Sequence, residues 1–342
     1  MLEAVKSAKQ SIYWESYSLY EDKDTYEFLN ALKEKSRQGV RVKGVVDGFG
    51  GFWASSKTIN DLRSTGIEVL FFNRLIPWWN RFSFRHWWFL RTHRKILIID
   101  EQIVFTGGVN IGVWYGKWLD LQVRLTGVIV RHFLRTFAKV YKICGGEDKD
   151  VLHWINEKKK FRQLETWLLE HWPIKRKSVL RRYYKSRIAS AKKQVLIVTP
   201  YFVPHFWFNN LLISAVKRGV NVEVVMPEKT DIRLAQMPNR IFADLLSRKG
   251  VKFFFTKEMI HAKVLIIDDR EGMVGSNNID AQSFDYNVEA SVVFKRKDIV
   301  GNLNRIIENW KKIAEPFDFT QPSRKWYYPL LVFIARILQP IL

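Results

Sequence analysis

Hydrophobic and polar positions follow the same order twice along the chain. Residues 32–47 (LKEKSRQGVRVKGVVD) are typical of the end of an amphipathic helix, a turn at Gly39 and a buried strand. Residues 215–227 (AVKRGVNVEVVMP) repeat this order, with a glycine at the same place. A second pair, residues 64–72 and 248–255, again joins a helix end to a strand through a glycine. The chain is therefore predicted to contain two copies of one α/β unit.

A third pair of matching segments begins with a histidine in each half. Residues 93–100 read HRKILIID and residues 261–268 read HAKVLIID. The histidine comes 27 residues after the preceding glycine turn in the first half but 11 residues after it in the second. The first half is therefore expected to carry an insertion of about 16 residues, at about residues 74–91.

These repeats predict an α/β fold with two similar lobes, each a mixed β-sheet flanked by helices. The lobes are expected to be related by a pseudo-twofold axis, with a shared site at their interface. The predicted organisation is a first lobe over residues 1–145, a helical connector over 146–185, a second lobe over 186–320 and an amphipathic segment over 321–342.

Both histidine segments carry the same set of polar side chains. His93 and His261 are each followed by a lysine after two positions, an aspartate after seven and an asparagine after 17. The matched residues are Lys95 and Lys263, Asp100 and Asp268, Gly107 and Gly275, Gly108 and Ser276, Asn110 and Asn278, and further downstream Asp120 and Glu289. One such motif occurs by chance in some chains, but two copies with shared downstream spacing indicate a function. The alternative is that both histidines begin buried strands and both lysines are solvated.

The alternation of side chains along a strand divides these residues into two groups. His93 and Lys95 fall on one face of their strand, and Asp100 falls on the other. The motif aspartates, Asp100 and Asp268, are therefore expected to be structural. The downstream acids are better placed to accept a hydrogen bond from a histidine ring and so to fix its tautomer.

Two imidazoles, two lysines and two amides around one pocket suit a phosphodiester. The lysines and asparagines would stabilise the charge that develops on the nonbridging oxygens. One imidazole would attack phosphorus while the other gives a proton to the leaving oxygen and later takes one from the acceptor. The acids are too few and too dispersed to hold a divalent ion, so no metal or other cofactor is predicted.

Charge narrows the choice of partner. The chain has 342 residues and a formal net charge of +22, which indicates a polyanion such as nucleic acid or an anionic membrane surface. A single cysteine, Cys144, excludes an internal disulfide scaffold. The chain shows no cleavable signal, and its apolar stretches are shorter than the roughly 20 residues of a spanning helix, so none is predicted.

Two aromatic segments are candidates for contact with a membrane. The insertion mixes aromatic residues with four arginines, a composition that favours the headgroup region of anionic lipid. The tail (KWYYPLLVFIARILQPIL) is consistent with a helix lying in the interface plane. In each case the alternative is packing on the protein's own core. The predicted membrane-binding residues are Trp78, Trp79, Trp87, Trp88, Phe89, Trp326 and Phe333.

The motifs together resemble the phospholipase D superfamily, whose signature is a duplicated His-x-Lys-x4-Asp with a downstream Gly-x-x-Asn. The resemblance covers about residues 2–317 and is closest to the bacterial cardiolipin synthases, through residues 93–112, 199–204 and 260–289. One position departs from the family's Trp-x-Asp-x-His, because Gln122 stands in place of the histidine.

The resemblance implies a phosphatidyltransferase that works through a phosphohistidine. His93 is then the expected nucleophile and His261 the acid and base, with an alcohol such as phosphatidylglycerol as acceptor. The implied partners are anionic phospholipids, phosphatidylglycerol and cardiolipin, at the cytoplasmic face of a bacterial inner membrane, and nucleic acid is not expected. The alternatives are a phospholipase D hydrolase, a metal-independent nuclease of the same superfamily, or a lipid-binding module with a decayed site.

Overall fold

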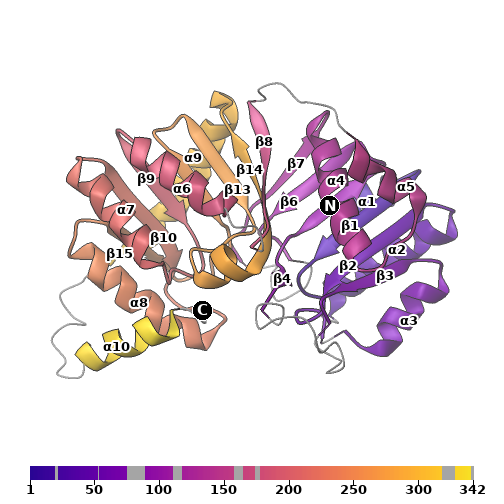
Figure 1. Cartoon of the computed structure of the whole chain (residues 1–342), viewed down its shortest axis with the longest axis horizontal. Helices are drawn as coiled ribbons and strands as arrows, with labels where there is room; N and C mark the ends of the chain where they lie inside the picture. The colour runs from indigo at the N-terminus through magenta and orange to yellow at the C-terminus, as the bar shows by residue number, and fades with distance from the viewer. Residues whose placement is uncertain are drawn as a thin grey trace.

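The computed structural model describes residues 1–19, 22–52, 54–74, 89–110, 118–157, 165–173, 178–317 and 328–339. It shows two α/β lobes side by side, with helices on the outer face of each sheet (Figure 1). The two-lobed fold predicted from the repeats is therefore confirmed.

The first lobe is built on a six-stranded sheet in the order β3-β2-β1-β5-β6-β7. Its first three strands are parallel to one another, and β5 pairs antiparallel with β1. β6 and β7 then continue the sheet as antiparallel neighbours. The strands are β1 (Ser11–Ser16), β2 (Arg41–Asp47), β3 (Glu68–Phe72), β5 (Ile96–Ile99), β6 (Ile103–Gly107) and β7 (Gln122–Thr126).

The second lobe repeats this order and extends it. Its sheet runs β15-β11-β10-β9-β12-β13-β14-β4, and β8 also pairs with β14. Here β9, β10 and β11 are the parallel strands, and β12 pairs antiparallel with β9. The strands are β4 (Arg91–Thr92), β8 (Thr166–His171), β9 (Gln194–Val198), β10 (Asn221–Pro227), β11 (Lys252–Thr256), β12 (Val264–Ile267), β13 (Glu271–Gly275), β14 (Asn287–Phe294) and β15 (Ala314–Pro316). Because β4 comes from the first half of the chain, the two lobes are joined by backbone pairing.

Helix, glycine and strand follow one another as the sequence predicts. α2 (Lys23–Arg37) leads through Gly39 into β2, and α7 (Phe206–Lys217) leads through Gly219 into β10. The two glycines have φ of +85° and +82°, a region that is costly for residues with a Cβ. The same short link therefore returns each helix onto its sheet.

The two sheets share one hydrophobic core. Phe133 and Phe137 of α4 (Ile129–Ile143) pack in the same cluster as Ile98 of the first sheet and Val292 of the second. Two separate clusters fill the outer faces of the two sheets. The remaining helices are α1 (Leu2–Ser7), α3 (Ser56–Ser64), α4 (Ile129–Ile143), α5 (Lys149–Leu152), α6 (Val179–Ser190), α8 (Arg233–Ser247), α9 (Lys297–Lys312) and α10 (Tyr328–Leu338). The lobes thus pack as one body.

The connector between the lobes is not wholly helical, as residues 146–185 were predicted to be. It contains α5 and the start of α6, but between them β8 pairs along β14, from Glu289 opposite His171 to Phe294 opposite Thr166. The prediction of a helix was therefore wrong for the residues of β8. The physical reason is that the backbone N–H and C=O groups along the edge of β14 need hydrogen-bond partners. β8 supplies these partners, and its apolar residues cover the edge.

The segments predicted to contact a membrane are only partly described. Trp78, Trp79, Trp87, Trp88 and Trp326 lie outside the described residues. Phe89 and Phe333 lie within them and are both exposed. None of the helices in the described ranges has the length and apolar character needed to cross a bilayer.

Candidate functional site

The two histidines of the repeat lie at equivalent places in the two lobes. His93 and Lys95 stand directly before β5, and His261 and Lys263 stand directly before β12. Because β5 and β12 run antiparallel to β1 and β9, both segments start at the carboxyl ends of the parallel strands. This is the edge of an α/β sheet where ligands commonly bind.

Each histidine is held by the lobe that does not carry it. His93 donates from Nδ1 to Oε1 of Glu289 at 3.1 Å, and His261 donates from Nδ1 to Oδ2 of Asp120 at 2.7 Å. The backbone N–H of each histidine also donates to the carbonyl of the residue just before that carboxylate, at 3.0 and 2.9 Å. Carboxylate pairing of this kind fixes the tautomer and leaves Nε2 with its lone pair free to react.

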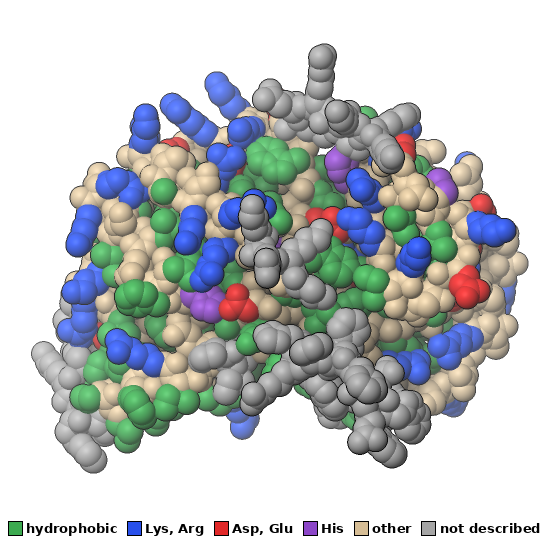
Figure 2. Space-filling model, in the orientation of Figure 1, with side chains coloured by type: hydrophobic (Ala, Val, Ile, Leu, Met, Phe, Trp, Pro, Cys, Tyr) green, Lys and Arg blue, Asp and Glu red, His purple; other side chains and the backbone are tan. Residues whose placement is uncertain are grey.

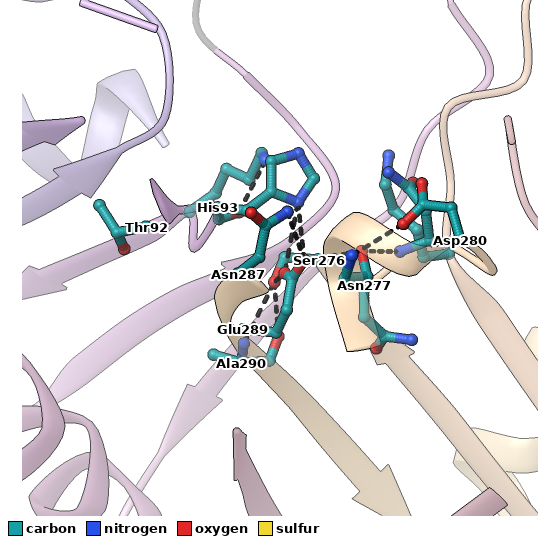
Figure 3. A network of polar contacts seen from close by, with 12 residues as sticks. Thr92, His93, Ser276, Asn277, Asp280, Asn287, Glu289 and Ala290 are labelled. Atoms are coloured by element: carbon teal, nitrogen blue, oxygen red, sulfur yellow. Dashed lines mark hydrogen bonds and ion pairs between the residues drawn. The ribbon is translucent and has the colours of Figure 1, made fainter. Parts of the chain in front are cut away.

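Glu289 is the centre of a dense polar network, which Figure 3 shows around His93. Ser283 donates to its Oε1 at 2.8 Å, and Asn287 adds a longer bond of 3.4 Å. Ser276 donates to its Oε2 and in turn accepts from the backbone N–H of Ala290. A fully buried carboxylate with several donors holds both its charge and its orientation.

Both carboxylates are charged despite their burial. Burial works to raise the pKa of Glu289, but His93, Lys95 and the hydrogen bonds outweigh it and lower that pKa to about 2. At Asp120 burial again acts upward, and the charge and hydrogen bond of His261 lower the pKa below its usual value. Each acid is therefore a permanent acceptor for its histidine at neutral pH.

The imidazoles themselves are driven toward the neutral form. Burial, and after it the charge of Lys95, lowers the pKa of His93 to about 4, although Glu289 opposes the shift. Burial and Lys263 likewise lower the pKa of His261, against the opposing charge of Asp120. A neutral ring with Nδ1–H bonded to a carboxylate presents Nε2 as a nucleophile or base.

Two lysines are buried together beside these rings. The Nζ of Lys95 donates to the carbonyl of His93 at 2.7 Å, and the Nζ of Lys263 donates to the carbonyl of His261. Burial, followed by the charge of Lys263, lowers the pKa of Lys95 to about 7, and burial lowers that of Lys263 to about 8. The two lysine cations have lost contact with water and repel each other. Binding of an anion between them is therefore strongly favoured.

The two asparagines complete the repeated set. Asn110 and Asn278 are both buried, and within the described part of the chain the Oδ1 atom of each has no hydrogen-bond partner. Buried polar atoms are rarely left unpaired, so each amide has capacity for a ligand. The charge of Lys263 reaches His93 and that of Lys95 reaches His261, so the two halves share one electrostatic environment.

The motif aspartates lie at the opposite ends of their strands, where they bind backbone. The carboxylate of Asp100 accepts from the N–H groups of Lys9, Gln10 and Ser11 at 2.7 to 3.1 Å. Asp268 accepts in the same way from the three residues that lead into β9. The two aspartates therefore tie a tight turn to the start of the neighbouring strand and do not reach the histidines.

Small residues downstream of the motif allow the acids to come close. A Cβ at Gly108 would lie 2.2 Å from Oδ1 of Asp120, and one at Gly107 would lie 2.2 Å from the carbonyl of Leu121. In the second lobe a Cβ at Gly275 would lie 1.9 Å from Oγ of Ser291. Any larger side chain at these positions would push the segment that carries the acid away from its histidine.

Two aromatic residues at the site were not among the predicted residues. The ring of Tyr17 meets His93 edge-on at 5.1 Å between centroids, and the Nζ of Lys95 lies 5.4 Å from the same ring. Trp118 lies against His261 at 5.3 Å. No sequence motif surrounds Tyr17. Trp118 stands two residues before Asp120, and this closeness to a predicted acid could have identified it.

In the part of the chain that the structure describes, no group of three or more His, Cys, Asp or Glu residues is placed to hold a metal ion. The charges of Lys95 and Lys263 act on both histidines.

Comparison with curated proteins finds many cardiolipin synthases. The chain is 28% identical over 357 residues to the cardiolipin synthase of Halalkalibacterium halodurans, an alignment that covers 99% of this chain and 69% of that protein. It is 30% identical over 329 residues to cardiolipin synthase 2 of Bacillus anthracis, covering 92% of this chain and 62% of the relative. The relatives are thus longer than this chain.

Solved structures support the same fold. Phosphatidylserine synthase of Haemophilus influenzae superposes with a TM-score of 0.75 over all of this chain and 92% of that one, at 12% identity. Polyphosphate kinase of Porphyromonas gingivalis superposes with a TM-score of 0.58 over 90% of this chain and 47% of that one, at 14% identity. The family model described as "Cardiolipin synthase, PLD-like domain" matches residues 1–119 and 184–311, which is well over half of the sequence. The chain therefore belongs to the family of phospholipase D-like cardiolipin synthase domains.

Proposed function

We propose that the protein is a phosphatidyltransferase of the cardiolipin synthase type. It would transfer a phosphatidyl group through a covalent phosphohistidine to an alcohol such as phosphatidylglycerol. The observation that supports this most is the pair of buried histidines, each held by a carboxylate from the other lobe, beside two buried lysines. The names of the relatives point to cardiolipin as the product.

In the proposed first step the Nε2 of His93 attacks phosphorus. The phosphorus–oxygen bond to the leaving alcohol breaks, and His261, whose protonated form is favoured by the bound phosphodiester anion and by Asp120, gives its proton to that oxygen. Asp120 stabilises the imidazolium form of His261 during the cycle. Lys95 and Lys263 bind the nonbridging oxygens, and an anion between them relieves their mutual repulsion.

In the second step the acceptor alcohol enters and His261 takes its proton. The alkoxide attacks phosphorus, the phosphorus–nitrogen bond breaks, and His93 is restored with the electron pair of that bond. With phosphatidylglycerol as both donor and acceptor, the products are cardiolipin and glycerol. Water in place of the acceptor gives phosphatidic acid, which is the hydrolase alternative.

The proposed location is the membrane surface at the cytoplasmic face of a bacterial inner membrane. A net charge of +22 favours anionic lipid, and the exposed Phe89 and Phe333 are apolar side chains in the two segments predicted to contact it. The same membrane contact is proposed for Trp78, Trp79, Trp87, Trp88 and Trp326.

The test is incubation of the purified protein with phosphatidylglycerol vesicles, followed by mass spectrometry of the lipids. We expect cardiolipin and glycerol from the wild type, none from His93→Ala, and a normal yield from a matched control, His153→Ala, at an exposed position. The proposal fails if the wild type makes neither cardiolipin nor phosphatidic acid, or if His93→Ala makes as much product. Phosphatidic acid alone would favour the hydrolase, and cleavage of a labelled oligonucleotide without added metal would favour the nuclease.

A further inference from the structure

Exposed apolar side chains are concentrated around the ends of the strands that carry the site. We propose that these side chains form the surface by which the protein lies on an anionic phospholipid bilayer, with the site facing the lipid headgroups. We call this surface the docking face. It consists of Phe49 and Phe52 in the first lobe, Phe206, Ile232 and Leu234 in the second, and Leu330, Phe333 and Ile337 on α10.

In the first lobe the docking face is connected to the reacting histidine. Phe49 and Phe52 follow the carboxyl end of β2 and are 54% and 62% exposed. The backbone N–H of Phe49 donates at 2.8 Å to one oxygen of Asp47, and the other oxygen accepts from the N–H of Thr92 at 2.9 Å. Thr92 is the residue directly before His93, so these phenylalanines lie on the same loop framework as the site.

The second lobe repeats the arrangement. Phe206 follows β9 and is 75% exposed, and Ile232 and Leu234 follow β10 and are 46% and 55% exposed. Between them, Tyr201 donates from its hydroxyl to Asp231 at 2.5 Å, and Asp231 in turn influences the pKa of Lys263. Exposed apolar side chains thus follow matching strand ends in both lobes, which a random scatter of surface residues would not do.

α10 extends this surface. Its buried Ala335 packs towards α8, Tyr328 donates to Asp244 near the end of α8, and Gln339 donates to the carbonyl of Pro204 just before α7. The helix therefore ends beside the start of α7, where Phe206 lies. On its other side Leu330, Phe333 and Ile337 recur at helical spacing and stay 53 to 60% exposed. Figure 2 shows hydrophobic side chains along the lower left, where Figure 1 places α10.

Charge selects the occupant of this face. Lys229 stands three residues before Ile232, Arg233 directly follows it, and Arg336 adjoins Ile337. All three cations are exposed, and none has an ion pair in the described ranges. The acids nearby are engaged, since Asp231 accepts from Tyr201 and Glu228 lies 3.8 Å from a guanidinium. Apolar side chains interspersed with free cations match the boundary between acyl chains and anionic headgroups.

The orientation rests on the proposed function, whereas bilayer binding does not, so the test separates the two. We compare the wild-type protein with a variant that carries Leu330→Ser, Phe333→Ser and Ile337→Ser. The matched control carries Val128→Ser, Ile143→Ser and Ile313→Ser, which remove equally exposed apolar side chains outside the docking face. Circular dichroism and thermal unfolding confirm that both variants fold.

Binding is measured by co-sedimentation with vesicles of phosphatidylglycerol and phosphatidylcholine. We expect the α10 variant to bind at least about tenfold more weakly than the wild type and the control to bind as the wild type does, because three partly inserted apolar side chains are lost. Equal binding by the α10 variant, equal loss in the control, or no binding by the wild type would overturn the proposal. So would a fall in oligomeric state in the α10 variant with unchanged vesicle binding, since the face would then join two copies.

Activity on two forms of the substrate completes the test. On monomeric short-chain phosphatidylglycerol we expect all three proteins to have the same kcat/KM, and on vesicles only the α10 variant to lose activity. If none of the proteins turns over either substrate, the proposed function fails while the binding result stands. If the α10 variant loses activity equally on both forms, the docking face is not a membrane surface.

Discussion

At the scale of single residues, the site depends on matching each imidazole with one carboxylate. The sequence predicted the histidines, the lysines and the acids because their spacing is local and repeated. It did not reveal that Glu289 serves His93 and Asp120 serves His261, because that exchange depends on how the lobes pack. Tyr17 was not predicted because it contacts the ring of His93, which is 76 residues away in the sequence. A contact between such distant residues leaves no local pattern.

The crossed carboxylates make a first prediction. Glu289→Gln keeps the shape of the side chain but removes the charge that orients His93 and stabilises its cationic form. We expect kcat to fall by about 10² to 10⁴ with a smaller change in KM, by analogy with loss of the acid in a catalytic triad. The measurement is steady-state turnover of phosphatidylglycerol. An unchanged kcat would show that this carboxylate does not act on the histidine.

A second prediction concerns pH. The pKa of Lys95 is lowered to about 7 and that of Lys263 to about 8, chiefly by burial, so each lysine is a cation below that pH and neutral above it. We expect kcat/KM, which reports the free enzyme, to fall as the pH rises through about 7 to 8. A profile measured with short-chain substrate that stays flat up to pH 9 would contradict this.

The same lysine gives a third prediction, on stability. Burial of Lys95 disfavours its charged form. Lys95→Met should therefore raise the free energy of unfolding by about 1 to 3 kcal/mol, and it should also abolish turnover. Because the folded pKa lies below the unfolded one, the native lysine costs most at low pH, and the gain should shrink above about pH 7. Denaturant unfolding at two pH values measures this. Lys217→Met, at an exposed position, is the control and should change little.

At the scale of secondary structure, the repeat predicted the helix, glycine and strand order because each link is short. It failed at β8, whose pairing with β14 is decided by an open sheet edge far along the chain. The prediction that Asp100 and Asp268 are structural residues rests on strand alternation. In the structure both carboxylates accept from backbone N–H groups away from the histidines.

A fourth prediction tests that separation. Burial acts to raise the pKa of Asp268, but hydrogen bonds from Gln194, Lys193 and Lys192 lower it. Asp268→Ala should therefore cost about 1 to 3 kcal/mol of unfolding free energy at pH 7, with kcat unchanged below the unfolding range. The cost should vanish as the pH falls through the lowered pKa, where the wild type loses the same stabilisation. Asp61→Ala, which breaks only the exposed pair with Lys33, should cost much less.

At the scale of the whole molecule, the duplicated sequence predicted two lobes around one site. It could not show that both sheets share a single core, nor that β4 of the first half completes the sheet of the second, because both depend on packing between distant segments. Net charge, in contrast, can be counted directly from the sequence. A net charge of +22 attracts the protein to anionic surfaces.

A fifth prediction follows from that charge. Binding to vesicles that contain phosphatidylglycerol should weaken steeply as the salt concentration rises, because exposed charges are screened beyond a Debye length of about 10 Å at 0.1 M. Activity on monomeric short-chain lipid should be less sensitive, since the buried lysines are screened less. Co-sedimentation and turnover over the same salt series compare the two. Vesicle binding that does not respond to salt would contradict an electrostatic contribution.

The crossing of the carboxylates also bears on how the protein is made. His93 and Glu289 are separated by 196 positions, so a ribosome that has completed the first lobe has produced a histidine without its acid. A chain that ends before Glu289 therefore lacks this contact, which can form only after β14 has emerged and paired with β4 beside His93.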